Sequence, residues 1–485
     1  MGVLKKLASE TVIYGLSSIV GRFLNYLLVP FYTAVFMPEE YGIVTELYSY
    51  AAFLNVVFTY GMETTYFRHC NRAGSDTDKV FYEIQSMVLF STLLLSLPVI
   101  IFSNNIAALL QHPGKGDLIV WLILTIAIDA ILALNFARLR QEKKAKKFAL
   151  IKITNILVNI GLNIFLLVIS VQYLSHTFLS KDVRLVFVAN FFANIFQIVF
   201  FGRYFTNWRW PRLNWQTVKP YLLYGMPLLV MGLAGMTNEV IDRIMLKFLL
   251  PNDFYTGKSA LAAVGIYGAC YKLSIFMSLG IQAFRYASEP FFFAKALDKD
   301  SPTLYAKVMH WFVWVCAGVL IFISLNLDWI QFVLRSPEYR EGLVVVPLLL
   351  AANMFLGIYY NLSIWYKLTD KTQYGMYISL VGAVVTIGLN IALVPILGYV
   401  GSAWATLGCY LLMALGSYVF GQKHYPIPYD LTFVLATLLV SITASVTLWE
   451  YIPYSHKFTS IVLKNLLATG LVSALFLLGK KLKSF

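Results

Sequence analysis

The chain has 485 residues, of which 59% are hydrophobic, 16% aromatic and only 13% charged, and its formal net charge is +14. A water-soluble globular protein does not need so large an apolar fraction, so that class is excluded. The positive charge is explained by loops that face anionic lipids, so no nucleic-acid partner is expected.

Apolar runs of about 20 residues, each long enough to cross a hydrocarbon layer of about 30 Å as a helix, recur along the whole chain. We therefore predict an all-α polytopic membrane protein with about fourteen transmembrane helices. The first run has no small-residue cleavage site behind it, so we expect a retained span and not a signal peptide. The predicted spans lie near residues 11–34, 42–66, 82–108, 118–139, 150–172, 184–203, 220–250, 262–285, 306–327, 343–365, 374–395, 400–421, 430–449 and 458–479.

The first span carries a charge near its middle. Arg22 lies roughly 16 Å from the inner end at 1.5 Å per residue, and a charge at such depth costs about 2.5 to 3.5 kcal/mol on insertion scales. Asn25 follows on the same helix face, and Pro30 can bend the helix one turn later. We predict that Arg22 and Asn25 face a wet cavity and contact the substrate. The alternative is a structural ion pair between Arg22 and Asp129 in the fourth span.

The sequence IGLNI occurs twice, at 160–164 in the fifth span and at 387–391 in the eleventh. Other short landmarks keep the same order in both halves, namely Tyr14-Gly15 and Tyr224-Gly225, Pro38 and Pro251, and Gly42-Ile43 and Gly265-Ile266. Two parallel six-helix repeats explain this order, and shared membrane-helix composition is the alternative. We predict six-helix bundles at 1–215 and 216–425 and two additional helices at 426–485.

The second half has its own embedded charges. In the seventh span Arg243 lies four residues after Glu239, so the two side chains can pair along the helix. The alternative is that Arg243 binds substrate together with Lys272, near the middle of the eighth span, and Arg285, nearer its cytoplasmic end. With Arg22, these residues predict a cationic cavity and an anionic cargo.

The basic residues predict the topology. With the amino terminus inside, 26 of the 38 Lys and Arg residues lie on the inner side, eight lie outside and four lie within spans. Cytoplasmic loops retain Lys and Arg, so both termini are predicted to be cytoplasmic.

No enzymatic motif is found. The chain has no G-x-x-x-x-G-K-[ST] phosphate loop and no H-E-x-x-H pair, and its four cysteines are scattered singly. We therefore expect a transporter, without a catalytic residue or a bound cofactor.

The segment YGLSSIVGRFLNYLLVPFYTAVFMPEEYGIVTELYSY resembles the opening of the polysaccharide transporter family, most specifically in GRxxNxxxxPFYT at 21–33 and PEEYG at 38–42. These are Wzx-type flippases of the multidrug/oligosaccharidyl-lipid/polysaccharide (MOP) superfamily. The resemblance implies a MATE-like fold in a bacterial inner (cytoplasmic) membrane. It also implies that undecaprenyl-pyrophosphate-linked oligosaccharide, an O-antigen or capsule repeat unit, moves from the inner to the outer leaflet by alternating access. A cation-coupled drug or metabolite antiporter of the multidrug and toxin extrusion branch is the alternative.

The family resemblance also implies partners and an ion site. The expected partners are lipid-linked oligosaccharide, membrane lipids, a polysaccharide polymerase and a chain-length regulator. The related lipid II flippase implies a groove for the lipid tail beside the last two spans. It also implies a coupling site for Na⁺ or H⁺. The alternative is that the residues of that site serve only in ordinary helix packing. The residues placed by resemblance in the ion site are Asn238, Asp242, Thr386, Asn390, Ser402 and Thr406.

Overall fold

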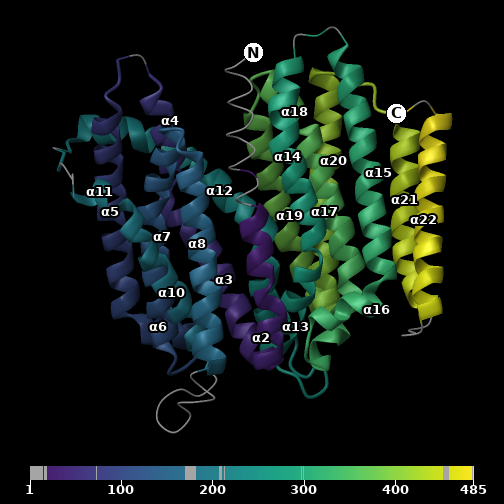
Figure 1. The fold of residues 1–485 in the computed structure, drawn as a ribbon, viewed down its shortest axis with the longest axis horizontal. Coiled ribbons are helices and arrows are strands. Elements are labelled where there is room, and N and C mark those ends of the chain that lie inside the picture. Colours follow the sequence, from purple (N-terminus) through teal and green to yellow (C-terminus); the bar gives the residue numbers. More distant parts are fainter. Residues whose placement is uncertain are drawn as a thin grey trace. The chain divides into compact units, whose positions relative to one another are not determined.

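The fold is given by a computed structural model, which describes residues 15, 19–72, 74–169, 182–206, 210–211, 213–296, 298, 300–451, 458–482 and 484. Within these residues the regular structure is entirely helical (Figure 1). The first residues of the first predicted span and residues 170–172 of the fifth lie outside the described residues.

The helices confirm the prediction of an all-α polytopic membrane protein. Among the described residues, eleven helices are long and apolar enough to cross a membrane, and a pair bent by 50°, Ala260–Leu273 and Ile275–Phe293, can form a twelfth span. Two shorter apolar helices, Ile19–Val35 and Leu431–Thr447, lie at the first and thirteenth predicted spans. Every predicted span therefore has a helical counterpart in the same order.

The chain forms two compact units, which we name unit 1 (Met1–Leu28 and Ile43–Met236) and unit 2 (Val29–Gly42 and Thr237–Phe485). The helices of the first half are α2 (Leu28–Val35), α3 (Pro38–Thr59), α4 (Met62–Cys70), α5 (Thr77–Ile101), α6 (Ser103–Leu109), α7 (Gly116–Gln141), α8 (Ala145–Ile164), α10 (Arg184–Ile198) and α11 (Gly202–Thr206), with a π-helical turn at Phe165–Ile169.

The helices of the second half are α12 (Trp215–Leu249), α13 (Ala260–Leu273), α14 (Ile275–Lys295), α15 (Ser301–Leu325), α16 (Leu327–Ile330), α17 (Val345–Leu362), α18 (Ile364–Leu368), α19 (Gln373–Leu397), α20 (Tyr399–His424), α21 (Leu431–Tyr451) and α22 (Phe458–Lys481). Because the unit boundaries fall inside α2, α3 and α12, each of these three helices contributes residues to both units. The duplicated six-helix bundles at 1–215 and 216–425 stay a prediction.

The asparagine of the pentapeptide has the same burial and the same hydrogen bond in both copies. Asn163 in α8 and Asn390 in α19 are both fully buried, and each side-chain amide donates a 2.8 Å hydrogen bond to the carbonyl four residues earlier. An asparagine in an apolar span satisfies its donor in this way at low cost.

Glycines join the start of α3 to α13 within unit 2. A Cβ atom on Gly265 would lie 1.9 Å from the carbonyl oxygen of Pro38, and one on Gly42 would lie 2.0 Å from that of Leu261. Both contacts require the absence of a side chain, as in close helix pairs of membrane proteins. The Gly-Ile landmarks of the two halves therefore meet at one helix crossing.

Pro30 interrupts the first helix, as its sequence predicts. The helix has a turn at Leu27, whose N–H donates to the Leu24 carbonyl over 3.0 Å. Proline has no N–H for the carbonyl four residues earlier, which belongs to Tyr26, and its ring crowds that turn.

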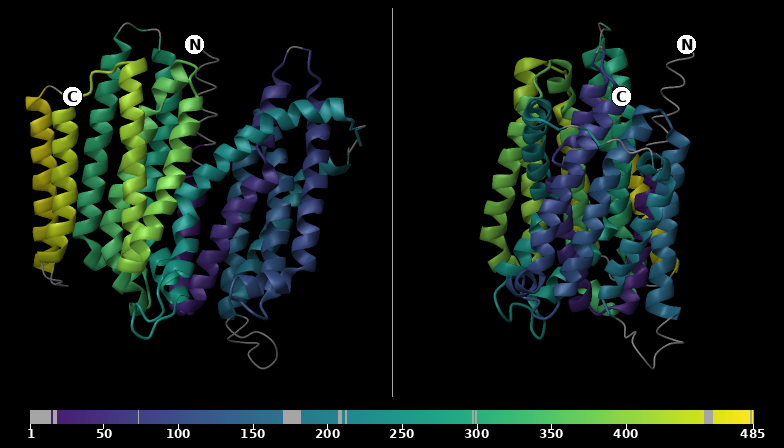
Figure 2. Two further views of the ribbon diagram at one scale, coloured as in Figure 1. Left: turned by 180° about the vertical axis from the view of Figure 1, so that it is seen from behind. Right: turned by 90° about the vertical axis from the view of Figure 1, so that its left-hand side faces the viewer.

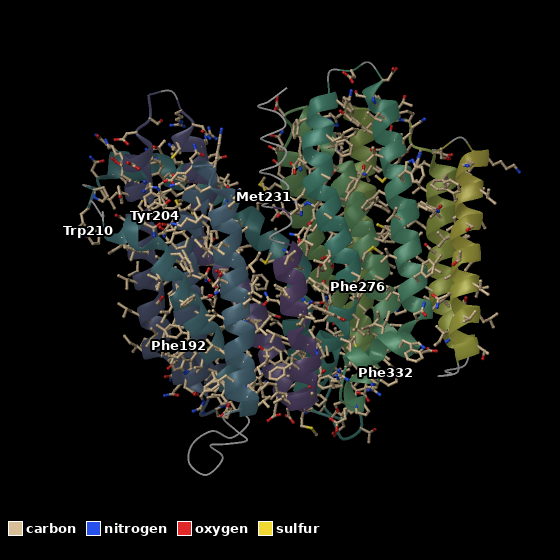
Figure 3. The ribbon with its side chains drawn as sticks, in the orientation of Figure 1. Phe192, Tyr204, Trp210, Met231, Phe276 and Phe332 are labelled. Carbon is tan, nitrogen blue, oxygen red and sulfur yellow. The ribbon has the colours of Figure 1, made fainter. Side chains whose placement is uncertain are left out.

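The last two helices pack on α15 at one edge of unit 2 (Figures 1 and 2). Trp314 Nε1 donates to the carbonyl of Val472 over 3.0 Å, and a buried ion pair joins Lys464 of α22 to Asp328 of α16. Large apolar side chains such as Phe192 and Phe276 stay exposed on the helix surfaces (Figure 3), as expected where lipid replaces water.

Candidate functional site

A buried polar cluster lies within unit 2, where the second half of α12 meets α13, α19 and α20. Its centre is formed by two residues of α12, Asn238 and Asp242, which are 6% and 3% exposed. They lie four residues apart and therefore on one face of the helix. Because both side chains are buried, each polar atom in the cluster must find a partner among the others.

Asn238 connects α12 to two other helices. Its amide nitrogen donates to the carbonyl of Ser379 in α19 over 3.0 Å, and its amide oxygen accepts from the Thr386 hydroxyl over 3.3 Å. Its backbone carbonyl accepts from the Tyr410 hydroxyl of α20 over 3.1 Å. These contacts fix both the rotamer of Asn238 and the rotation of α12 against α19 and α20.

Asp242 has donors on both carboxylate oxygens. The Tyr267 hydroxyl of α13 donates to Oδ2 over 2.6 Å, and the Thr406 hydroxyl of α20 lies 3.5 Å from the same oxygen. The Arg243 guanidinium forms an ion pair with Oδ1 at 3.3 Å. This buried charge is thus compensated by a neighbour in the sequence, which is the condition for keeping a carboxylate inside a span.

Arg243 is oriented by three groups. Its Nη1 donates to the backbone carbonyl of Glu239 over 2.7 Å, and the guanidinium carbon lies 4.0 Å above the ring of Tyr271. The predicted alternative of a Glu239–Arg243 side-chain pair is therefore wrong: the carboxylate partner is Asp242, and Glu239 contributes its carbonyl. Arg243 is only 8% exposed, and its charge is already matched.

Asn390 joins α19 to α20 at the end of the cluster. Its amide oxygen accepts from the Ser402 hydroxyl over 3.0 Å, while its nitrogen donates to the Thr386 carbonyl. The six residues predicted as an ion site, on three helices, are thus all buried and lie in one network. The sequence analysis did not identify Tyr267 and Tyr410 as members of this network. Tyr267 lies four residues before Tyr271, and this spacing places both hydroxyl-bearing rings on one face of the helix.

The cluster has the oxygen atoms that a Na⁺ ion prefers, but the arrangement does not fit a bound ion. The Asp242 carboxylate, the Thr406 hydroxyl and the Asn390 carbonyl are hard oxygen ligands. Each of them already has a partner, and a guanidinium lies against the only carboxylate of the network. A cation would have to displace Arg243, so this geometry favours a structural role for Asp242.

The predicted substrate residues are divided between the two units. Arg22 and Asn25 are exposed and belong to unit 1, whereas the other three belong to unit 2. The alternative partner of Arg22, Asp129, accepts instead from Asn194 over 2.8 Å. Arg22 is therefore available on the helix surface, as the substrate hypothesis requires.

Lys272 and Arg285 flank the bend between α13 and α14. Lys272 is exposed and lies two residues before the break at Ser274. The eighth span was expected to be one continuous helix, and the structure divides it into two helices at this break. Arg285 is exposed, with its guanidinium carbon 3.9 Å above the Tyr360 ring. It lines a pocket of about 20 Å³ with the ion pair Glu289–Lys367, a space that fits a water molecule.

A larger pocket lies between α14 and α15. Its volume is about 310 Å³, and its lining includes Phe276, Ile281, Phe284, Trp311 and Val315. The Trp311 ring also packs 6.0 Å from the ring of Phe476 in α22. Its lining side chains are almost all hydrocarbon, which suits an acyl or isoprenoid chain and not a sugar.

Comparisons with known proteins cover both sequence and structure. The family model described as "Polysaccharide biosynthesis protein" matches residues 7–295, more than half of the chain. No curated protein matches the chain significantly in sequence.

Solved structures share the fold at low identity. The lipid II flippase MurJ in an inward closed conformation aligns with a TM-score of 0.68 and 13% identity, over 97% of this chain and 99% of that one. A multidrug resistance MATE family transporter of the MOP superfamily, in an inward-facing conformation, aligns with a TM-score of 0.67 and 12% identity, over 86% of this chain and 95% of that one. These structures share a polytopic transporter fold with this chain.

Proposed function

We propose that this chain, which belongs to the polysaccharide biosynthesis protein family, is a flippase that moves a lipid-linked oligosaccharide across a membrane. The cargo that fits best is an undecaprenyl-pyrophosphate-linked repeat unit of an O-antigen, capsule or exopolysaccharide. The family match carries this proposal. The transport direction would be from the inner to the outer leaflet, by alternating access.

The extent of the fold similarity supports a lipid-linked cargo. The alignment with the lipid II flippase spans 97% of the chain, whereas the alignment with the multidrug transporter spans 86%. The apolar pocket between α14 and α15, which touches α22 through Trp311, is suited to a lipid tail.

Exposed cations support an anionic headgroup. Arg22, Lys272 and Arg285 are exposed within predicted spans, and we propose that each contributes positive charge to pyrophosphate binding. Arg243 takes no direct part in this binding, because its guanidinium is buried against Asp242.

A cation-coupled drug or metabolite antiporter is the second candidate, since the multidrug transporter shares the fold. Such a protein would need an exposed acid in its binding site to select a cation. Of the exposed charged residues of the spans named above, Arg22, Lys272 and Arg285 are basic and Glu239 is acidic, and this excess of positive charge favours an anion. Transport of a cationic dye by the purified protein would support the antiporter.

The excess of basic residues on one side supports an inner-membrane location with both termini in the cytoplasm. A polysaccharide polymerase and a chain-length regulator are proposed partners, since they would consume the exported unit.

The proposal is tested in a strain that lacks the gene, by measuring lipid-linked oligosaccharide on the inner leaflet and polysaccharide at the surface. Arg22→Ala should cause inner-leaflet accumulation, because the pyrophosphate loses a charge-assisted partner in a low-dielectric site. Arg22→Lys should recover part of the export, since it keeps the charge but loses the planar fork. Normal export by Arg22→Ala at the same membrane level would remove Arg22 from the mechanism. Failure of the wild-type chain to restore export would remove the function.

A further inference from the structure

A pocket of polar side chains lies in unit 2, where α14 packs against α17 and α18. Each side of the pocket contributes a residue followed by others three, four and seven positions later, a spacing that places all four on one helix face. The lining residues are Arg285, Ser288, Glu289 and Phe292 on one side, and Tyr360, Ser363, Ile364 and Lys367 on the other. The distribution of basic residues predicts that this end of both helices lies toward the cytoplasm.

The base of the pocket is apolar and closely packed. Phe292 and Ile364 are each 2% exposed and belong to one core cluster with Tyr305. Ser363 is 3% exposed, and its hydroxyl donates to the Tyr360 carbonyl over 2.6 Å. The charged side chains therefore extend from a fixed base, and their ends remain partly exposed.

Arg285 supplies one cation of the pocket. Its guanidinium carbon lies 3.9 Å above the Tyr360 ring, and no carboxylate of a described residue forms an ion pair with it. An aromatic ring orients a guanidinium without neutralising its charge. Arg285 can therefore still offer charge-assisted hydrogen bonds to an anion.

Lys367 supplies the second cation, and a carboxylate of the protein already binds it. The Lys367 Nζ atom lies 2.8 Å from Glu289 Oε1, and the two side chains are 29% and 46% exposed. An ion pair this exposed is weak, because water screens it and two long side chains must be ordered to form it. Glu289 therefore occupies Lys367 without being fixed there.

We propose that Glu289 is an internal competitor for Lys367, which the diphosphate of the cargo displaces in order to bind Arg285 and Lys367 together. This inference rests on the proposed function. A diphosphate ester carries two negative charges on two phosphoryl groups, so it can engage both cations, whereas Glu289 engages one. No covalent bond changes: the carboxylate leaves the ammonium for water, and phosphate oxygens replace it.

The size of the pocket agrees with this exchange. With Glu289 on Lys367 the free volume is about 20 Å³, which fits a water molecule and not a phosphoryl group. Departure of the Glu289 side chain is therefore a condition for binding. Because the pair is exposed, this departure costs little.

The internal competitor gives the pocket a preference among phosphates. A singly charged phosphodiester, such as the headgroup of an ordinary phospholipid, gains from Lys367 little more than Glu289 already supplies. A diphosphate gains from Lys367 and Arg285 at once. Glu289 is thus a specificity-determining residue, which allows a diphosphate-linked cargo to be selected from a leaflet rich in monophosphate lipids.

Binding of inorganic pyrophosphate to the purified full chain in phosphatidylcholine nanodiscs tests the exchange without transport. Lys367→Met should weaken binding about tenfold, because a charge-assisted partner is lost. Glu289→Gln should strengthen it about fivefold, because a neutral amide does not compete for the ammonium. Both side chains are partly exposed, so neither substitution should prevent folding. Unchanged affinity in both variants would overturn the proposal.

The double variant distinguishes competition from simple repulsion. If Glu289 acts through Lys367, adding Glu289→Gln to Lys367→Met should bring no further gain. The same gain with and without Lys367 would mean that Glu289 only repels the anion, and the competitor role would be wrong.

Asp298→Asn is the matched control. Asp298 pairs with Lys295 at 2.8 Å near the same end of α14, outside the pocket, so its removal changes the net charge equally. Pyrophosphate affinity should not change in this variant. A gain equal to that of Glu289→Gln would reduce the effect to net charge and overturn the proposal.

A lipid headgroup is distinguished from the cargo by the nanodisc composition. Phosphatidylglycerol should weaken pyrophosphate binding to the same extent in the wild type and in Lys367→Met, through surface charge alone. A loss confined to the wild type would assign the pocket to a leaflet phospholipid and overturn the cargo assignment.

The outcomes also separate this site from the proposed function. If the wild-type chain restores export but the variants bind pyrophosphate equally, the internal competitor is wrong and the flippase stands. If the variants behave as expected but the wild-type chain does not restore export, the pocket stands as a diphosphate site, and its assignment to this cargo fails together with the function.

Discussion

Asp242 and Arg243 are neighbours in the sequence, and on a helix neighbours point about 100° apart and rarely interact. They pair here because the Tyr271 ring and the Glu239 carbonyl turn the guanidinium back toward the carboxylate. The four-residue spacing predicted a pair of Arg243 with Glu239 instead. The outcome at this residue depends on α13, which supplies Tyr267 to the carboxylate and Tyr271 to the guanidinium.

Removing one partner of this pair should destabilise the protein. Asp242→Asn leaves Arg243 buried and unpaired, which typically costs about 3 to 5 kcal/mol. Asp242→Asn combined with Arg243→Gln should recover most of the loss, since no buried charge remains. The unfolding temperatures of the single and the double variant in detergent test this prediction. If the single and double variants melt at the wild-type temperature, Asp242 is not held by an energetically important pair.

The close crossing of α3 and α13 depends on two glycines, which have no side chain to hold the helices apart. Gly42 and Gly265 let backbone atoms of the two helices approach closely, so the contact is made between main chains. Such packing depends on van der Waals contact, because lipid supplies no hydrophobic driving force between helices.

A methyl group at this crossing should therefore be costly. Gly265→Ala should destabilise the protein by about 1 to 3 kcal/mol, because its Cβ would overlap the Pro38 carbonyl and force the helices apart. Gly388→Ala on α19 is the matched control, since no atom outside its own helix lies within 4 Å of its Cβ position. Comparing the unfolding temperatures of the two variants tests the crossing. Equal values would show that α3 and α13 can separate without loss.

The attachment of α22 to unit 2 depends on a few polar contacts. Asp328 and Lys464 are 2% and 4% exposed, and Asn326 and Asn465 exchange amide hydrogen bonds of 3.1 Å next to them. These contacts fix the depth of α22 against α15 and α16, which apolar surfaces alone would leave free to slide.

Lys464→Met should loosen α22, because it leaves the Asp328 carboxylate buried without its cation. We expect faster proteolysis near α22 and a lower unfolding temperature. Lys464→Met with Asp328→Asn should restore both, as a neutral amide can share the network of Asn326 and Asn465. Wild-type proteolysis of the single variant would mean that apolar packing is sufficient.

At the scale of the whole molecule, the basic residues predict which loops face the cytoplasm. The four native cysteines are buried, so an introduced exposed cysteine can be labelled selectively. Lys146→Cys, in the basic segment QEKKAKK, should stay unreacted with an impermeant thiol reagent in intact cells and react after the membrane is opened. Thr256→Cys, in the loop after α12, should react in intact cells. The reverse pattern would invert the topology.

The sequence alone determined the class, the order of spans and the family. Hydropathy is a property of consecutive residues, so runs long enough to cross a bilayer could be read directly, and all of them have helical counterparts. The resemblance to the lipid II flippase also placed six polar residues in one site, and these residues lie in one buried network of unit 2.

Only the tertiary structure decided what the helix faces contact. It paired Asp242 with Arg243 and brought Gly42 and Gly265 to one helix crossing. It also joined Asn194 to Asp129 by a hydrogen bond and assigned Val29–Gly42 to unit 2. Each of these depends on the rotation and crossing of helices that lie far apart in the chain. A hydropathy pattern leaves that rotation open, because in lipid every face of an apolar helix is equally acceptable until a specific neighbour packs against it.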